Sequence, residues 1–437
     1  MMILGVKDKP TKGKWFALSF QHLFAMFGAT ILVPMLTGLP ISVALFASGA
    51  GTLIYILCTK AKVPVYLGSS FAFINVIVIV SGYNPEITNS GHYGAVLTGL
   101  FVVGIIYSLM ALLVRLLGTN WINKLLPPVV VGPMIMVIGL GLATTAIESA
   151  GFAGGSWQEM LTAVVSFLIV TLVAIKAKGF LKIIPFLIGI VGGFIFASLV
   201  GLVDFTNFLN AFNAGEWFKI PEFMFLGFKE GNANFLGSNL TFYKFDFRAV
   251  LTIAPLAFVT AAEHVGDHAV IGKIVEKDFL KDPGLHRTLL GDGIATSFAA
   301  LIGGPANTTY GENTSVVGMT KVASVWVTGG AAVFAIILSF FNLFVTLIAS
   351  IPGAVMGGIS IILYGFIAAN GLRVLIDSKV NVANTRNLII IATMLVIGIG
   401  GAVVNFGENF SLYGMSLAAV IGIILNLILP EEKEELS

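Results

Sequence analysis

The chain has few charged side chains: only 11% of its 437 residues are Asp, Glu, Lys or Arg, against about 25% in an ordinary soluble domain. Hydrophobic residues make up 57% of the chain, and the mean hydropathy is +0.98. This composition excludes a soluble globular enzyme, a disordered chain and a coiled coil. It also excludes a transmembrane β-barrel, because barrel strands alternate polar and apolar residues. We therefore expect a polytopic α-helical protein whose surroundings are the lipid bilayer.

Cysteine, net charge and catalytic motifs are scarce as well. Cys58 is the single cysteine, which excludes an intrachain disulfide and a cysteine-based metal cluster. The net charge of +2 is too small to indicate a nucleic-acid partner. The sequence has no HExxH, no nucleophile elbow and no Walker loop. His264 and His268 adjoin acidic residues, but neighbouring helical positions diverge by about 100°, so these side chains cannot converge on one ion. We expect neither a metal nor an organic cofactor, and a membrane enzyme is the least favoured class.

Long apolar runs dominate the chain instead. A membrane span needs about 20 apolar residues, and twelve runs qualify. They lie near residues 15–36, 41–59, 93–114, 125–147, 158–175, 183–203, 249–266, 288–303, 323–349, 351–372, 387–404 and 411–429. Two further segments, Gly68–Val80 and Asn307–Thr320, are too short or too often interrupted by polar residues for a simple span. Counting both predicts fourteen crossings.

The distribution of basic residues supports this count. Cytoplasmic loops carry an excess of Lys and Arg. With both termini cytoplasmic, 20 of the 24 basic residues, Lys433 near the C-terminus included, fall on the cytoplasmic side. The other four lie in or at the end of one long outside loop, about 204–247. This loop is rich in Phe, which predicts an aromatic belt at the membrane interface with a short amphipathic helix; a gating role is the alternative.

The two short segments are third and tenth in order, so they occupy matching positions in two halves of seven spans. An odd number of spans makes the second half inverted relative to the first, and paired, interrupted spans are typical of a transporter binding site. Phe71 to Val80 would form only about 15 Å of helix, half of a hydrocarbon core of about 30 Å. The rest of the crossing must be unwound, which is tolerated only where protein or a cavity satisfies the backbone. A re-entrant loop without a ligand is the alternative.

Four of the 22 acidic residues lie within or close to apolar runs: Glu263, Asp267, Asp292 and Glu312. A carboxylate inside the membrane is costly, so these residues are functional candidates. Asp267 lies one helical turn beyond Glu263 on the same face. It either couples to Glu263 or faces cytoplasmic water. Asp292, near the start of the ninth span, is interpreted as a structural anchor at the cytoplasmic end.

Five longer motifs resemble those of the nucleobase–ascorbate transporter family, and within it the bacterial uracil permeases. The resemblance covers nearly the whole chain. The motifs are Gln21-His22-Leu23-Phe24-Ala25-Met26-Phe27-Gly28-Ala29-Thr30, Leu67-Gly68-Ser69-Ser70-Phe71-Ala72-Phe73, Ala262-Glu263-His264-Val265-Gly266, Asp282-Pro283-Gly284-Leu285-His286-Arg287 and Asn307-Thr308-Thr309-Tyr310-Gly311-Glu312-Asn313.

The resemblance implies an architecture: an all-α polytopic membrane protein of fourteen spans in a seven-plus-seven inverted repeat. Short antiparallel β-strands would lie in the broken spans 3 and 10. A core domain would comprise 15–115 and 248–349, and a gate domain 121–203 and 350–430, with the extracellular loop at 204–247. A homodimer in the bacterial plasma membrane, with both termini cytoplasmic, is expected.

The resemblance also implies a site and an activity. Glu263 and Glu312 would bind substrate through their carboxylates, and the backbone at Phe71 and Gly311 would add hydrogen bonds. Further lining residues would be Ala29, Ser70, Tyr310 and Tyr364. The implied activity is proton-coupled import of a nucleobase, with uracil as the expected substrate. A protonated Glu263 could donate to a substrate carbonyl and a deprotonated one could not, so Glu263, with Asp267, would link proton binding to substrate binding.

The sequence departs from the family pattern at three positions. Ser315 stands where the family has Gly, Lys321 where it usually has Arg, and Asp267 where uracil permeases carry His. Asp267 is typical of purine-transporting relatives, whereas Glu at position 312 favours uracil. A xanthine or purine symporter therefore remains an alternative, and an anion transporter or channel on the same architecture is the alternative from another class. The anion class would require a basic residue in the pocket, and no Lys or Arg lies in the middle of a predicted span.

Overall fold

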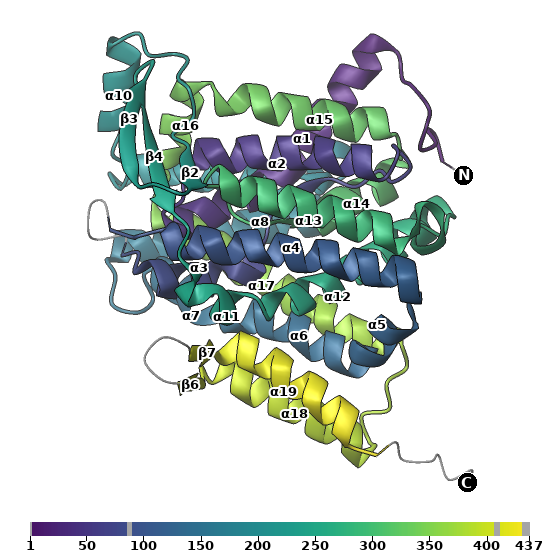
Figure 1. Ribbon diagram of the computed structural model, residues 1–437. Coiled ribbons are helices and arrows are strands. Elements are labelled where there is room, and N and C mark those ends of the chain that lie inside the picture. Colours follow the sequence, from purple (N-terminus) through teal and green to yellow (C-terminus); the bar gives the residue numbers. More distant parts are fainter. Residues whose placement is uncertain (1, 85–89, 406–410, 431–437) are drawn as a thin grey trace.

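The computed structural model describes residues 2–84, 90–405 and 411–430. Lys433, which was counted above as cytoplasmic, lies outside the described residues. Most of the described chain is helical, and the long helices run roughly parallel to one another (Figure 1).

The first half of the chain supplies eleven of the helical elements, counting two short 3-10 turns, and the first strand, in the described residues. They are α1 (Lys12–Thr37), α2 (Ile41–Cys58), β1 (Leu67–Ser69), η1 (Phe71–Phe73), α3 (Ile74–Ser81), α4 (Gly94–Leu117), α5 (Asn120–Leu125), α6 (Pro128–Gly141), α7 (Ala143–Ser149), α8 (Trp157–Lys176), η2 (Gly179–Ile183) and α9 (Pro185–Leu199). Local sequence explains several ends. α6 and α9 begin at a proline, whose missing N–H costs nothing at the first helical position. α8 begins with a capping box of Ser156 and Glu159.

The second half contains the matching helices. They are η3 (Phe247–Ala249), α11 (Val250–Ile253), α12 (Leu256–Val275), the π-turn η4 (Leu280–Gly284), α13 (Leu285–Leu301), β5 (Asn307–Thr309), α14 (Gly311–Thr320), α15 (Val325–Ser339), α16 (Asn342–Ala349), α17 (Gly353–Asp377), α18 (Thr385–Ile399), β6 (Val403–Asn405), β7 (Ser411–Tyr413) and α19 (Gly414–Ile428). A helix therefore lies at each of the fourteen predicted segments. Six of them are long and apolar enough to cross a membrane, or up to seven if the pair η3–α11 and α12, bent by 45°, is one span.

The helices pack in two sets. In one set, α13 packs against α4 and α2, α15 packs against α2 and α1, and α12 packs against α4 and α14. In the other, α17 packs against α6, α8 and α9, and α18 packs against α19 and α6.

The segment between α9 and α11 folds into α10 (Thr206–Asn213) and a three-stranded sheet, in the order β2–β4–β3. The strands are β2 (Met224–Gly227), β3 (Gly231–Phe235) and β4 (Ser238–Lys244). The short helix was predicted, but the sheet was not. A second unpredicted pair, β6 with β7, joins α18 to α19. The all-α expectation therefore needs correction at these two places.

The predicted single span 323–349 is also divided, because α15 ends at Ser339 and α16 begins at Asn342. The backbone groups freed at the break bond to the segment between α10 and β2: Lys219 N–H donates to Phe340 O at 3.0 Å, and Asn342 N–H donates to Trp217 O at 2.9 Å.

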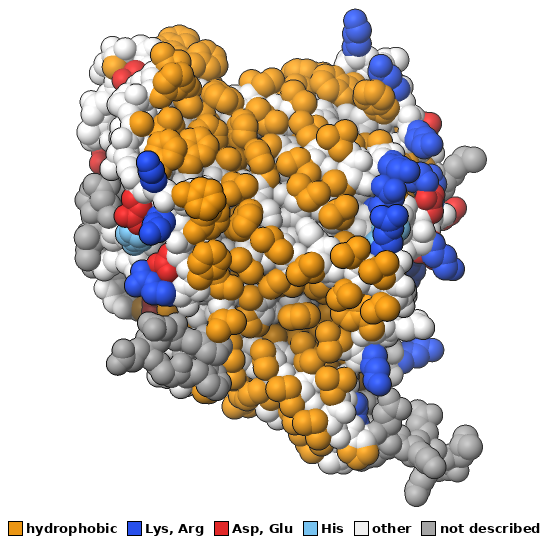
Figure 2. Space-filling view, viewed as in Figure 1, with side chains coloured by type: hydrophobic (Ala, Val, Ile, Leu, Met, Phe, Trp, Pro, Cys, Tyr) orange, Lys and Arg blue, Asp and Glu red, His pale blue; other side chains and the backbone are white. Residues whose placement is uncertain are grey.

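The two ends of the helical bundle differ. The sheet β2–β4–β3 and α10 lie at one end, while the start of α1 and the end of α19 lie at the other (Figure 1). Figure 2 shows apolar side chains covering the middle of one face, with Lys and Arg gathered mainly at the end where α1 starts. Large apolar side chains such as Leu57, Leu116 and Val396 are 69–77% exposed. A soluble monomer rarely exposes so continuous an apolar surface, which suits contact with lipid.

Candidate functional site

Two short strands from distant parts of the chain meet in the interior. β1 pairs with β5 in antiparallel register, with Leu67 opposite Thr309 and Ser69 opposite Asn307. The backbone bonds continue beyond both ends, from Ser70 N–H to Ala306 O at 2.9 Å and from Tyr310 N–H to Tyr66 O at 3.0 Å. The antiparallel pair predicted for the two interrupted segments is therefore present at those residues.

Buried polar side chains of the neighbouring helices hold this strand pair. Asn307 donates through Nδ2 to Ala47 O, and Thr296 donates to Asn307 O, both at 2.7 Å. The Thr52 hydroxyl makes two hydrogen bonds to the backbone of Leu67: it accepts from Leu67 N–H at 2.9 Å and donates to Leu67 O at 3.2 Å. Buried hydrogen bonds of this kind favour one geometry, because breaking one leaves a buried polar group unpaired. Within the described residues, Asn307 Oδ1 has no hydrogen-bond partner.

Each strand leads directly into a short helix. After β1, the turn η1 begins at Phe71 and continues into α3 at Ile74; after β5, α14 begins at Gly311. The first N–H groups of a helix have no partner within the helix and carry a partial positive charge, so both starts can bind acceptor groups of a solute. The position at Gly311 is open, since a Cβ built there would meet no atom within 4 Å. Ser70 is 3% exposed, and Phe71 is half-buried.

The carboxylates come from α12 and α14. Asp267 accepts a hydrogen bond from the Thr309 hydroxyl at 2.5 Å, which brings the face of α12 that carries it against the end of β5. Glu263 lies one turn earlier, and Glu312 lies in the first turn of α14. All three side chains belong to half-buried residues. Asp267 thus binds the strand pair, a contact that the sequence did not predict; coupling to Glu263 and exposure to cytoplasmic water were the alternatives. Thr309 was not predicted as its partner, because nothing in the sequence distinguishes it from Thr308.

The remaining predicted residues surround the strand pair. Tyr310 is buried, its hydroxyl donates to Ser69 O at 2.9 Å, and its ring covers Gly68. Phe71 meets Tyr364 of α17 edge to face, with ring centroids 6.2 Å apart. Ala29 of α1 is 5% exposed. Tyr310 therefore supports the strands, and its buried ring is a poor candidate for stacking on a substrate.

Asp292, interpreted above as a structural anchor at the cytoplasmic end of the ninth span, lies two turns into α13 and is fully buried. It bonds to His264, a contact that sequence reasoning missed. In the part of the chain that the structure describes, no group of three or more His, Cys, Asp or Glu side chains could hold a metal ion.

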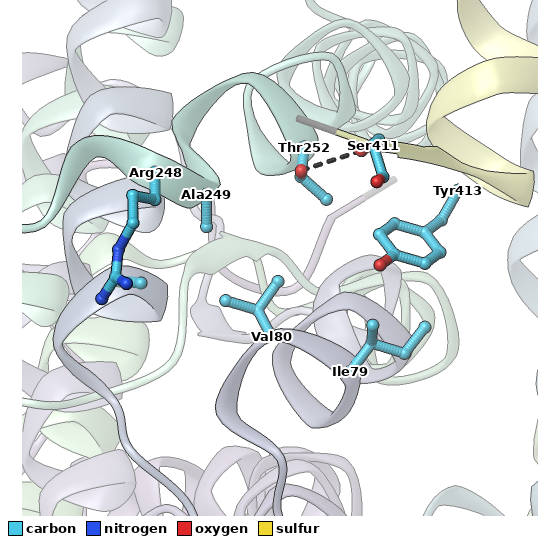
Figure 3. Close-up of a pocket in the computed structure, with 8 residues that line it drawn as sticks. Ile79, Val80, Arg248, Ala249, Thr252, Ser411 and Tyr413 are labelled. Atoms are coloured by element: carbon cyan, nitrogen blue, oxygen red, sulfur yellow. Dashed lines mark hydrogen bonds between the residues drawn. The ribbon is translucent and has the colours of Figure 1, made fainter. Parts of the chain in front are cut away.

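A cavity of about 370 Å³ lies away from these residues, toward the end of the bundle that carries the sheet (Figure 3). Arg248, Thr252 and Tyr413 help to line it, and the Thr252 hydroxyl donates to Ser411 O at 2.8 Å on one side of it. None of the predicted site residues lines this cavity. It is therefore not the candidate site.

Together, the apolar helices and the strand pair define a polytopic membrane protein with a polar site at two interrupted helices, the arrangement of a membrane transporter. The sequence model of the Permease family matches residues 13–407. The uracil permease of Bacillus subtilis (strain 168) is 49% identical over 441 residues, covering 99% of this chain and 96% of that protein. The uracil permease of Escherichia coli (strain K12) is 41% identical over 432 residues, covering 97% and 93%.

Solved structures share the fold at low identity. The transmembrane domain of the cyanobacterial bicarbonate transporter BicA has a TM-score of 0.61 and 14% identity, covering 95% of this chain and 97% of that one. The murine anion transporter Slc26a9 in its inward-facing state has a TM-score of 0.65 and 12% identity, covering 97% and 69%.

The chain belongs to the nucleobase–ascorbate transporter family, as its motifs predict. It is a multi-pass membrane transporter and not an enzyme.

Proposed function

We propose that this protein imports uracil across the bacterial plasma membrane together with a proton, by alternating access. One observation carries the proposal: the strand pair β1–β5 brings two helix starts together with carboxylates from α12 and α14. The identity of 49% with a uracil permease over nearly the full chain supports uracil as the substrate.

The chemistry of the site suits uracil, which is flat and neutral and carries two N–H donors and two carbonyl acceptors. Glu312 would accept from ring N–H groups, since hydrogen bonds to a charged acceptor are about twice as strong as neutral ones. The N–H groups at the start of η1 and α14 would donate to the carbonyls. Phe71 would pack against the ring. A site that pairs every edge group rejects analogues strongly, because a missing partner leaves a buried group unpaired.

Proton coupling would depend on Glu263. In its protonated form the side chain can donate to a uracil carbonyl, and in its ionised form it can only accept. Substrate and proton would then favour each other's binding by linkage. Asp267 lies one turn away and is bonded to Thr309. It would interact electrostatically with the negative charge that Glu263 carries when ionised. No cofactor other than the coupling proton is proposed.

We further propose fourteen spans in a seven-plus-seven inverted repeat, with both termini cytoplasmic. The packing pattern supports the repeat, because contacts in one half have counterparts in the other. α13 on α4 corresponds to α2 on α15, α8 on α9 corresponds to α18 on α19, and α17 on α8 corresponds to α6 on α18. The helix set around α2, α4 and α13 would be the core domain and the set around α6 and α17 the gate domain. The working form would be a homodimer.

A purine such as xanthine is the alternative substrate, because Asp267 replaces the histidine of uracil permeases. The anion class is less favoured. The likeness to anion transporters concerns the fold, whereas the side chains gathered here are carboxylates, which repel anions.

Uptake of radiolabelled uracil, xanthine and guanine by a permease-deficient bacterial strain, measured at about pH 6 and about pH 8, roughly one unit on either side of neutral pH, tests the proposal. We expect uracil uptake to exceed purine uptake and to be faster at the lower pH. Accumulation of xanthine with no uracil uptake would instead assign the purine alternative.

Glu263→Gln tests the coupling. The amide can still donate to a carbonyl but cannot release a proton, so the variant should bind uracil with little dependence on pH and should fail to accumulate it. Exchange of labelled for unlabelled uracil should survive, because exchange moves no net proton. Asp267→Asn in the same assay shows whether the neighbouring charge matters. Uphill uptake by Glu263→Gln with the wild-type pH profile would refute the proposed carrier.

A further inference from the structure

α12 carries a second polar face behind the one that bears the carboxylates. His264 and His268 are spaced i, i+4, as are Glu263 and Asp267, but the two pairs are turned by about 100° from each other. The carboxylates lie toward β5 and α14, whereas the histidines lie toward α2 and α13. Nothing in the transport chemistry above uses the histidines.

The histidine face is bonded in a defined way. Nδ1 of His268 lies 2.7 Å from His264 O, and because a carbonyl only accepts, this nitrogen carries the hydrogen. In the neutral ring Nε2 then accepts from the Tyr55 hydroxyl, at 2.5 Å. Nδ1 of His264 lies 2.6 Å from Asp292 Oδ2. The two imidazole rings stack, with centroids 3.9 Å apart.

These four side chains are completely buried, at 0–1% exposure. Asp292 Oδ1 and His264 Nε2 have no hydrogen-bond partner within the described residues. A buried, incompletely satisfied acid–imidazole pair is a weak source of stability, because desolvation offsets the attraction. What such a pair can supply is conformational specificity, here one arrangement of α12.

Other contacts of α12 hold its two faces: buried side chains such as Val259 and Ile271 pack against neighbouring elements, and Asp267 bonds to Thr309 of β5. The helix starts after the bend at Pro255, so it does not continue the axis of α11. A Cβ added at Gly266 would meet no atom within 4 Å, so the helix is loosely packed on that side. The two bonds of the histidine face, to α2 and α13, therefore act together with the Asp267–Thr309 bond on the other face to set how far α12 is turned.

We propose that His264, His268, Tyr55 and Asp292 are positioning residues that set the rotation of α12 and so aim Glu263 and Asp267 at the strand pair. The inference rests on the proposed function, because it is there that Glu263 and Asp267 take part in binding uracil and the proton. The groups facing this cluster are Tyr55 from α2, Tyr107 from α4 and Asp292 from α13, with Glu263 and Asp267 on α12 itself.

Tyr55→Phe is the sharpest variant, because it removes one oxygen and leaves the packing unchanged. Its matched control is Tyr93→Phe, which also removes a buried tyrosine bond, made by Tyr93 to Thr37 O at 2.9 Å and involving no residue of α12. We expect Tyr55→Phe to raise the KM for uracil about 10-fold, with maximal uptake rate and melting temperature close to those of Tyr93→Phe. Equal KM values in the two variants would overturn the proposal.

His264 offers a rescue test. In Asn the amide nitrogen lies near the place of Nδ1, and in Gln it lies near Nε2. His264→Asn should therefore keep the bond to Asp292 and a KM near wild type, while His264→Gln should lose both. Asp292→Asn should likewise be milder than Asp292→Leu, and combining His264→Gln with Asp292→Leu should add little to either alone. Equal effects of Asn and Gln at position 264 would contradict the assignment.

The rotation itself can be measured without substrate. In a Cys58→Ser background, Gly266→Cys places a thiol on the open side of α12, and its labelling rate by a small thiol reagent reports how the helix is turned. Tyr55→Phe should change this rate and Tyr93→Phe should not. If wild type takes up no uracil, the proposed function fails, but the labelling result still decides whether these residues set the rotation. An unchanged rate in Tyr55→Phe refutes the positioning role.

Discussion

Glu312 differs from the other intramembrane acids because it lies in the first turn of a helix, where the N–H groups stabilise an anion. We expect Glu312→Ala to lose a charge-assisted bond to substrate, worth about 1.5–3 kcal/mol or roughly 10- to 150-fold in affinity. Glu312→Gln should retain weak binding or shift the preference toward purines, because an amide offers only one acceptor oxygen. Direct binding of uracil to purified protein measures both, with Glu222→Ala in the segment between α10 and β2 as control. Wild-type affinity in Glu312→Ala would remove Glu312 from the site.

Glycine is required at position 68 because a neighbouring ring leaves no room for a side chain, and not because of the backbone conformation. A Cβ at this position would lie 2.3 Å from Cζ of Tyr310, so the ring covering the strand pair would have to move. We expect Gly68→Ala to cost about 1–3 kcal/mol through overpacking and to weaken uracil binding by displacing Tyr310. Thermal unfolding and uracil binding are the measurements. Gly365→Ala is the control, because its added Cβ would meet no atom within 4 Å; equal behaviour of the two variants would contradict the strand-pair role.

At the scale of elements, the N-terminal segment forms a strap that the sequence did not predict. Leu4 pairs with Val322 in a parallel bridge, Ala323 N–H donates to Leu4 O at 2.9 Å, and Val6 is buried. This strap lies against the turn between α14, which carries Glu312, and α15. Its sequence is short and mixed, so no periodicity marks it as ordered.

Cysteines test the strap directly. In a Cys58→Ser background, Leu4→Cys with Val322→Cys should form a disulfide under mild oxidation, because bridge partners face each other across adjacent strands. Ile3→Cys with Val322→Cys should cross-link poorly, since neighbouring residues of a strand point to opposite sides. Gel mobility with and without reductant measures both pairs. Equal cross-linking of the two pairs would show that the strap does not hold this register.

The elements that sequence predicts well are those whose cause is local. Gly68–Val80 and Asn307–Thr320 are short and interrupted, so half-helices follow from length alone, and the structure has strands leading into helices there. The break between α15 and α16 has a distant cause. Residues 323–349 contain no charged residue, and the freed backbone groups at Phe340 and Asn342 are satisfied by Lys219 and Trp217. Similarly, β3 is exposed along its whole length, so it lacks the alternation that would reveal a half-buried strand.

The residues of the candidate site also fall into two groups, those that the sequence alone could reveal and those that it could not. Glu263, Asp267 and Glu312 could be found because a carboxylate in an apolar run is conspicuous. Thr309, Tyr55 and the depth of Asp292 could not, because their roles depend on which helices meet. His264 and His268 gave a usable signal, an i, i+4 pair beside acids, but that spacing alone does not reveal partners on α2 and α13.

For the whole molecule, orientation in the membrane is the property still to be measured. Lys and Arg gather at the end of the bundle where α1 starts, and the sheet β2–β4–β3 lies at the other end (Figures 1 and 2). Because cytoplasmic loops carry the positive excess, we expect the sheet to face outside. With Cys58→Ser as background, Asn232→Cys in exposed β3 should react with an impermeant thiol reagent in intact cells. Lys277→Cys, exposed beyond α12 at the opposite end, should react only after the cells are permeabilised. Labelling of Lys277→Cys alone in intact cells would invert the topology, and with it the direction in which the strand-pair site must open to import its substrate.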